Sequence, residues 1–178
     1  VDTITNSDGY TLGGSGASMK NRIINGAMVI DQRNAGANTV ITTTGYTLDR
    51  WKATVASSSK ISVQQDFSSN TVAGANSSLK VTSLTANTVS SGDYYLIQQH
   101  IEGNNIIDLN WGTANAKPVS LSFWVRSSLT GTFGGSLGNN AFDYTYPFTY
   151  TISSANTWEY KTITISGPTS GTWLKTNG

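Results

Sequence analysis

Short β-type runs, separated by turn-forming residues, constrain the fold of this chain most strongly. Apolar and polar residues alternate within the runs, as in strands with one face in a core and one in water. No segment keeps the i, i+3, i+4, i+7 spacing of an amphipathic helix over three turns. The pattern predicts an all-β sandwich or barrel. The runs occupy residues 22–32, 48–55, 60–67, 78–85, 93–103, 117–128, 146–153 and 157–166.

Composition agrees with a folded β domain that does not bind through charge. Only 12% of the 178 residues are charged, the formal net charge is +1, and the basic residues form no run of three. Binding to nucleic acid or anionic lipid needs clustered Lys and Arg, so neither partner is expected. No stretch approaches 18 apolar residues, so no membrane insertion is expected. With no cysteine, stability must come from packing and backbone hydrogen bonds.

The chain divides into an arm and a domain. Residues 1–20 lack periodicity and end in a Gly/Ser cluster, which predicts a linker or docking arm. Residues 21–178 carry the strand pattern. Asn25-Gly26 lies between two apolar triplets that are too short to pair as a hairpin, so we expect one strand with a bulge there. Residues 104–111 are the best helical candidate, with one or two turns capped by Asn104 or Asn105.

Alternation also predicts which side chains are buried. In residues 119–126, Leu, Phe and Val share one face, while Trp124 and Arg126 share the opposite face with two serines. In residues 162–166, Ile163 and Ile165 oppose two threonines. The sheet therefore has a core side and a wet side, and the wet side carries large rings. Trp51, in the middle of the run at 48–55, is predicted to lie in the core.

Catalytic patterns in the sequence are weak. Residues 134–138 read Gly-Gly-Ser-Leu-Gly, which matches the nucleophile elbow of hydrolases. That elbow requires a following helix and a later histidine, whereas His100 is the only histidine and precedes Ser136. A glycine-rich hairpin is the better interpretation. Glu102 and Glu159 lie far apart in sequence and no carboxylate pair stands out, so we expect no enzyme activity.

Metal binding is limited to one open possibility. A single histidine and no cysteine exclude the usual transition-metal centres. No loop has the ligand spacing of an EF-hand, but a structural calcium ion held by aspartates stays open. We expect no other cofactor. The aspartates considered are Asp2, Asp8, Asp31 and Asp108.

Aromatic residues give the strongest indication of function. An aromatic ring flanked by Asn, Asp and Gln suits a sugar, because the ring stacks on C–H groups and the amides bind hydroxyls. Trp111, Tyr144 and Tyr146 are the expected stacking rings, and Gln98, His100 and Arg126 the expected hydrogen-bonding groups. The alternative is that these rings only close the ends of the sandwich.

Two segments, "NRIINGAMVIDQRNAG" and "YTLDRWKA", resemble a recurrent domain of tailed-phage tail fibres and other virion proteins. The resemblance continues through "IQQHIEG", "PVSLSFWVRSSLTGTFGG", "YPFTYTI" and "TWEYKTITISGPTSGTW", and so covers residues 20–178. The matching residues of the first two segments are Ile24, Asn25, Gly26, Met28, Ile30, Gln32, Arg33, Asp49, Arg50 and Trp51.

The resemblance implies a fold and a biological setting. Such domains look like jelly-roll carbohydrate-binding modules of the galactose-binding-like type, a β-sandwich of two antiparallel sheets with almost no helix. It further implies a non-catalytic module of a virion appendage that binds a host surface glycan, contacts other virion proteins and assembles as a homotrimer. Family domains run past "TWLKTNG" into a further strand, so this chain is expected to be truncated at its C-terminus.

Two alternatives to this function remain open. A purely structural fibre or capsid-decoration module would share the fold and bind no glycan. A glycan-cleaving enzyme would require an acid/base pair that the sequence does not mark.

Overall fold

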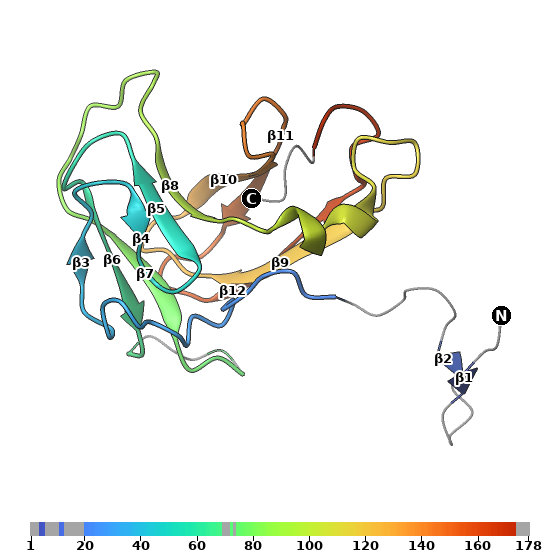
Figure 1. Ribbon diagram of the computed structural model, residues 1–178. Helices are drawn as coiled ribbons and strands as arrows, with labels where there is room; N and C mark the ends of the chain where they lie inside the picture. Colours follow the sequence, from blue (N-terminus) through green and yellow to red (C-terminus); the bar gives the residue numbers. More distant parts are fainter. Residues whose placement is uncertain (1–3, 6–10, 13–19, 69–71, 73, 174–178) are drawn as a thin grey trace.

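The computed structural model describes residues 4–5, 11–12, 20–68, 72 and 74–173, and their regular structure is almost entirely antiparallel β (Figure 1). The strands are β1 (Ile4–Thr5), β2 (Thr11–Leu12), β3 (Thr39–Val40), β4 (Gly45–Tyr46), β5 (Trp51–Val55), β6 (Ile61–Asp66), β7 (Ser78–Ser83), β8 (Tyr95–Gln99), β9 (Val119–Val125), β10 (Gly131–Gly138), β11 (Thr145–Ile152) and β12 (Glu159–Ile165). The helical elements of these residues are two 3-10 turns, η1 (Gly103–Asn105) and η2 (Ile107–Leu109). The all-β prediction is confirmed, and the two-sheet jelly-roll connectivity stays a prediction.

The first half of the chain packs two three-stranded sheets against each other, β3–β6–β7 and β4–β5–β8 (Figure 1). Leu48, Ala53 and Val63 are at most 1% exposed and form its centre together with Ile41. Trp51 lies half-buried against this centre, which supports its predicted core position. The other half-buried side chains packed there are Met28, Val55, Ile61, Leu79 and Ile97.

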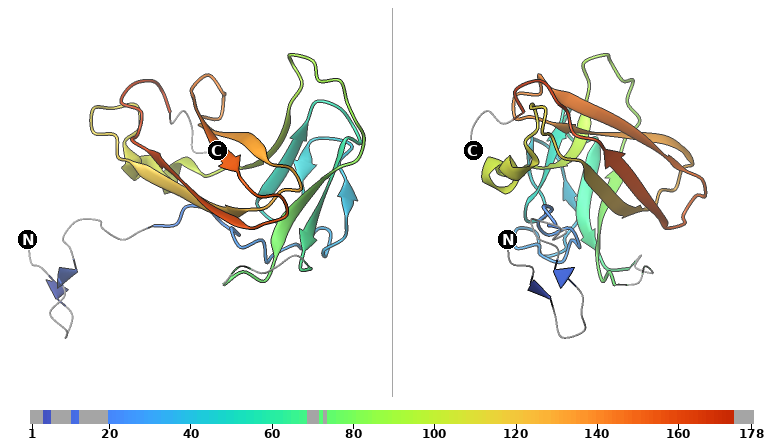
Figure 2. Two further views of the ribbon diagram at one scale, coloured as in Figure 1. Left: turned by 180° about the vertical axis from the view of Figure 1, so that it is seen from behind. Right: turned by 90° about the vertical axis from the view of Figure 1, so that its right-hand side faces the viewer.

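The second half is built from two antiparallel ribbons, β9–β12 and β10–β11 (Figure 2). Phe123 of β9 meets Tyr150 of β11 edge to face, with ring centroids 5.1 Å apart. Ile152 and Ile165 are at most 1% exposed. Burial also raises the pKa of Tyr150 above its usual value of 10.0. The apolar faces of the two ribbons therefore contain a second packing centre.

The alternation predicted for the later strands is confirmed. Along β9 and β12 every second residue is exposed, including Trp124 on β9 and two threonines on β12. Ile165, on the other face of β12, is fully buried. The glycine-rich hairpin is confirmed as well, because Ser136 lies within β10 opposite Pro147 of β11. A strand of this kind has none of the geometry of a nucleophile elbow.

The strand expected over residues 22–32 is wrong, because the structure has no strand there. Asn25 and Met28 both adopt left-handed backbone conformations, with φ of 53° and 57°. The Met28 N–H donates to the Asn25 carbonyl at 3.1 Å and closes a turn. Asparagine tolerates this conformation better than most residues, and its side chain can hydrogen-bond the nearby backbone. Local hydrogen bonds around Asn25 therefore take the place of the backbone hydrogen bonds that a paired strand would make.

Asn25 joins the first two sequence motifs. Its Nδ2 donates to the carbonyls of Ile30 and Asp49, both at 2.9 Å, and its Oδ1 accepts the Ile30 N–H at 3.1 Å. The Trp51 indole N–H donates to the Asn25 carbonyl at 3.0 Å. The Gln32 N–H donates to Asp49 Oδ2 at 2.7 Å. The two motifs thus fold as one unit, although residues 37–45 lie between them in the sequence.

Residues 104–111 form the expected short helical turns, but not with the expected caps. Glu102 precedes η1, and no side chain there caps the turn. η2 ends at Asn110, which adopts a left-handed conformation with φ of 53°. The predicted capping by Asn104 or Asn105 is therefore wrong. Of the predicted arm, β1, β2 and Lys20 are described, and its other residues lie outside the described part of the chain.

An ion pair ties η2 to the start of the domain. Arg22 donates from both terminal nitrogens to Asp108, at 2.8 and 2.7 Å, and Arg22 also bonds the Asn105 carbonyl. The Arg22 guanidinium lowers the pKa of Asp108 from 3.8 to about 2. Because this folded-state pKa lies below the unfolded value, the stabilisation is complete above about pH 4 and lost as pH falls through about 2.

We therefore expect an NMR titration of the Asp108 carboxyl carbon to give a midpoint near pH 2. Replacing Arg22 by glutamine removes the donor and should return the midpoint toward 3.8. An unchanged midpoint in Arg22→Gln would show that another group holds the carboxylate.

Candidate functional site

Three loops of the second half meet in a group of large rings, here named the aromatic end cluster: Trp111, Tyr144 and Trp173. Trp111 and Trp173 meet edge to face with centroids 5.2 Å apart. Tyr144 lies 6.2 Å from Trp173 in a tilted arrangement. The cluster brings together the loop after η2, the β10–β11 turn and the segment after β12.

Asn139 positions the β10–β11 turn against the last segment. It is only 5% exposed, and its Nδ2 donates to Asp143 Oδ1 at 2.6 Å and to the Thr172 carbonyl at 3.0 Å. The backbone N–H of Asn139 donates to the Tyr144 carbonyl at 3.0 Å. This side chain therefore sets how close Tyr144 lies to Trp173.

Glycine at position 171 allows the close approach of Tyr144. A Cβ added to Gly171 would stand 2.5 Å from the Tyr144 ring, and the φ of this residue is +92°. Any larger residue would both strain the backbone and displace the ring. The position of Tyr144 thus depends on glycine beneath it as well as on Asn139 beside it.

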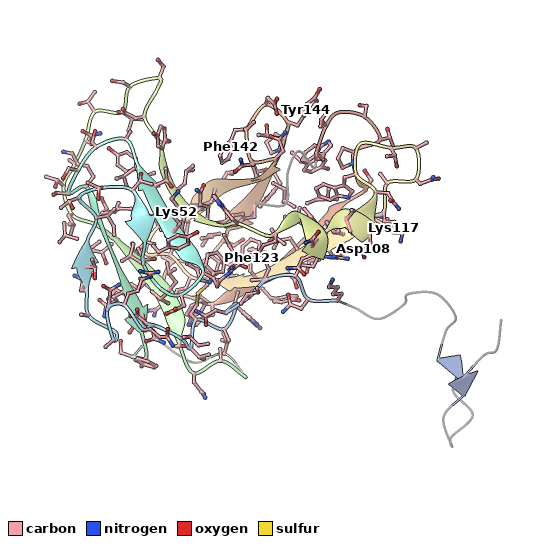
Figure 3. The ribbon with its side chains drawn as sticks, viewed as in Figure 1. Lys52, Asp108, Lys117, Phe123, Phe142 and Tyr144 are labelled. Carbon is pink, nitrogen blue, oxygen red and sulfur yellow. The ribbon has the colours of Figure 1, made fainter. Side chains whose placement is uncertain are left out.

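The three rings of the cluster differ in whether their polar groups can hydrogen-bond a ligand. The Trp111 indole N–H donates to the Lys117 carbonyl at 2.9 Å, and that of Trp173 to the Ser170 carbonyl at 3.1 Å. Both indoles can therefore offer a ligand only their rings. Tyr144 is 40% exposed, and its hydroxyl has no hydrogen-bond partner among the described residues. Figure 3 shows Tyr144 and Phe142 at the tip of the β10–β11 turn. Such a ring can stack on a sugar and bind one hydroxyl.

Gln98 and His100 lie elsewhere, on the outer face of the β4–β5–β8 sheet. Gln98 Nε2 lies 3.2 Å from His100 Nε2. Across the sheet, Gln98 is in register with Lys52, and Lys52 with Tyr46. The Arg33 guanidinium stands over the Tyr46 ring, 5.5 Å from its centroid. This row belongs to a different sheet from the loops that hold the aromatic end cluster.

The other two expected residues also lie apart from that cluster. Arg126 follows β9, and its Nε donates to the Asn156 carbonyl at 2.9 Å. Tyr146 lies within β11 on the half-buried face that also carries Phe148 and Tyr150. The structure therefore joins Trp111 with Tyr144, and Gln98 with His100, but does not gather all six residues into one site.

Sequence reasoning missed three residues that shape these surfaces. Trp173 was not among the expected stacking rings, and Asn139 carried no signal because its role depends on a partner 33 positions away. Tyr160 is exposed beside Trp124 on the wet face of β9–β12. Its even position in the alternation with Thr162 and Thr164 is a signal that could have identified it.

The aspartates considered for calcium have other partners where they are described. Asp31 accepts backbone N–H groups from Asn34 and Gly36, at 3.0 and 2.8 Å, and Asp108 binds Arg22. Asp2 and Asp8 lie outside the described residues. Within the described ranges, no three acidic or histidine side chains form a group that could hold a metal ion. In the same ranges no helix has the length and apolar character needed to cross a membrane.

Both glutamates are held as anions by neighbours. Glu102 has a lowered pKa because of a backbone hydrogen bond and the adjacent Arg50, whose Nη2 lies 2.7 Å from its carboxylate. Glu159 has a lowered pKa because Lys161 donates at 2.6 Å and the N–H groups of Ser154 and Ser153 donate at 2.8 Å. A general acid needs a raised pKa, so neither glutamate is suited to that role.

Comparison of this chain with protein-family models, curated proteins and solved structures gave no match.

Proposed function

We propose that this chain is a non-catalytic module of a virion appendage, such as a phage tail fibre, and that it binds a glycan on the host surface. The observation that carries the proposal is the aromatic end cluster, in which Tyr144 is half exposed and its hydroxyl has no hydrogen-bond partner among the described residues. The virion setting rests on the sequence resemblance alone. The anionic state of both glutamates supports a binding role over glycan cleavage.

The expected affinity of one module is low. One stacked ring and two or three hydroxyl contacts, each worth about 1 kcal/mol, give dissociation constants from millimolar to micromolar. A multivalent appendage would raise the useful strength through avidity. We therefore propose assembly as a homotrimer, in which the other virion proteins hold the modules on one axis. Sedimentation of the protein as a monomer at micromolar and higher concentrations would contradict this assembly.

A glycan array probed with the fluorescently labelled chain tests the binding function. We expect some surface polysaccharides to bind and Tyr144→Ala to weaken binding to them by about ten-fold, which corresponds to one lost contact of about 1.4 kcal/mol. Tyr94→Ala is a matched control, because Tyr94 is 48% exposed in the other half of the chain.

The array separates the proposal from its alternative. A blank array would favour the purely structural module. Binding that Tyr144→Ala leaves unchanged would place the glycan site away from the aromatic end cluster.

A further inference from the structure

The outer face of the β9–β12 ribbon carries an exposed aromatic pair. Trp124 and Tyr160 face each other in the strand register, with ring centroids 5.3 Å apart and planes tilted by 55°. Trp124 is 47% exposed and Tyr160 is 55% exposed. The rest of this face consists of small hydroxyl residues, all exposed: Ser120, Ser122, Thr162 and Thr164. The two rings therefore stand among exposed hydroxyl side chains on a face that no described element covers.

Arg126 supplies a positive charge at the end of this face that carries the aromatic pair. It follows Trp124 by two positions, immediately after β9 ends at Val125, so its Cα lies about 7 Å further along the chain. The alternation of exposed and half-buried residues continues through Arg126, which is exposed, and this assigns its side chain to the same side as Trp124. Its Nε donates to the Asn156 carbonyl at 2.9 Å, which holds the guanidinium in place. No carboxylate of the described residues forms an ion pair with Arg126. Among the described residues, the two terminal nitrogens have no hydrogen-bond partner and can bind a ligand.

The nearest acidic residue on the paired strand does not compete for this cation. Glu159 belongs to the opposite, half-buried face of β12. Its two oxygens already accept hydrogen bonds from Lys161 and from the backbone of Ser153 and Ser154. The wet face of the ribbon thus combines exposed rings with a cation whose charge is not neutralised.

We propose that Trp124, Tyr160 and Arg126 form a second saccharide site, specific for an acidic sugar that carries a carboxylate. The C–H face of the sugar stacks on the two rings. The carboxylate accepts two parallel N–H bonds from the planar guanidinium, a geometry that arginine supplies and lysine does not. Ser122 and Thr162 lie in the next cross-strand row and can bind sugar hydroxyls. This site shares no residue with the aromatic end cluster and can exist without it.

Calorimetric titration of the full chain with two probes tests the site. The probes are oligogalacturonate, which carries a carboxylate on each sugar, and the same oligomer after reduction of its carboxylates to neutral alcohols. We expect the acidic oligomer to bind at least about ten-fold more tightly, and the preference to shrink with added salt.

Variants then assign the binding to the three residues. Arg126→Gln should abolish the preference for the acidic oligomer, and Arg126→Lys should restore it only in part. Trp124→Ala should weaken binding of both oligomers by about ten-fold. Tyr144→Ala is the control and should leave both affinities within about two-fold. It also separates this site from the proposed function, since that variant should bind the array polysaccharides about ten-fold more weakly and keep its affinity for oligogalacturonate.

Several results would overturn the assignment. Equal affinity for the two oligomers, or a preference that survives in Arg126→Gln, would remove the role of the cation. Absence of binding by either oligomer at millimolar concentration would remove the site. If Trp124→Ala fails to fold, Arg126→Gln alone decides, because it changes an exposed side chain outside any strand.

Discussion

Replacing Asn25 by alanine is expected to lower the free energy of unfolding by about 3 to 5 kcal/mol. The side chain makes three hydrogen bonds, each worth about 1 kcal/mol, and alanine in a left-handed conformation costs about 1 kcal/mol more. Urea denaturation followed by tryptophan fluorescence measures the change. Because small domains have about 5 to 15 kcal/mol of stability in total, a loss of this size is large.

Two further variants separate the contribution of the hydrogen bonds from that of the left-handed backbone conformation. Asn25→Gly keeps the backbone conformation at no steric cost and removes only the three bonds, so it should lose about 1 kcal/mol less than Asn25→Ala. Asn140→Ala changes an exposed asparagine and should stay within about 0.5 kcal/mol of the unmodified chain. Equal stability of Asn25→Ala and Asn140→Ala would show that the bonds around Asn25 contribute nothing.

Replacing Trp51 by alanine is expected to cost about 3 to 5 kcal/mol. The ring packs against the cluster of Ile41, Leu48, Ala53 and Val63, and its indole N–H is the donor to the Asn25 carbonyl. Removal leaves a cavity beside that centre and an acceptor without its donor. The same urea experiment measures the loss.

The stability of Trp51→Phe should lie between that of the unmodified chain and that of Trp51→Ala. Phenylalanine keeps much of the packing and loses the N–H donor, at a cost of about 1 to 2 kcal/mol. Trp124→Ala is the matched exposed control and should cost no more than about 1 kcal/mol, the usual worth of a cross-strand pair. A Trp51→Ala loss as small as that of Trp124→Ala would mean that the indole does not belong to the core.

The strands of the second half could be predicted from the sequence because their information is local. Along β9, a side chain such as Phe123 or Trp124 reveals its face by parity alone, and the structure agrees. The structure of residues 22–32 could not be predicted in this way. The strand-like composition there is overridden by the amide of Asn25, which binds Ile30 nearby and Asp49 far along the chain.

The candidate sites show the same division. Trp111 and Tyr144 could be selected from the sequence because polar residues flank these rings, and both belong to the aromatic end cluster. Trp173 joins them only because Asn139 bonds the Thr172 carbonyl and Gly171 leaves room for Tyr144. Such contacts between distant loops have no periodic signature. Arg126 and Trp124 were both assigned to the wet face, but the register that sets Tyr160 beside Trp124 depends on which strands pair.

The two separate packing centres have a consequence for motion. In the first half, Leu48, Ala53 and Val63 are almost completely enclosed by two three-stranded sheets. Among the described residues of the second half, the two-stranded ribbons enclose only the apolar side chains of Ile152 and Ile165 to that degree. Regions with fewer buried contacts open locally at lower free energy, so the ribbons should open before the β5 and β6 core does. A ligand bound by the ribbon loops would then suppress that opening, so that binding would make the whole second half more rigid.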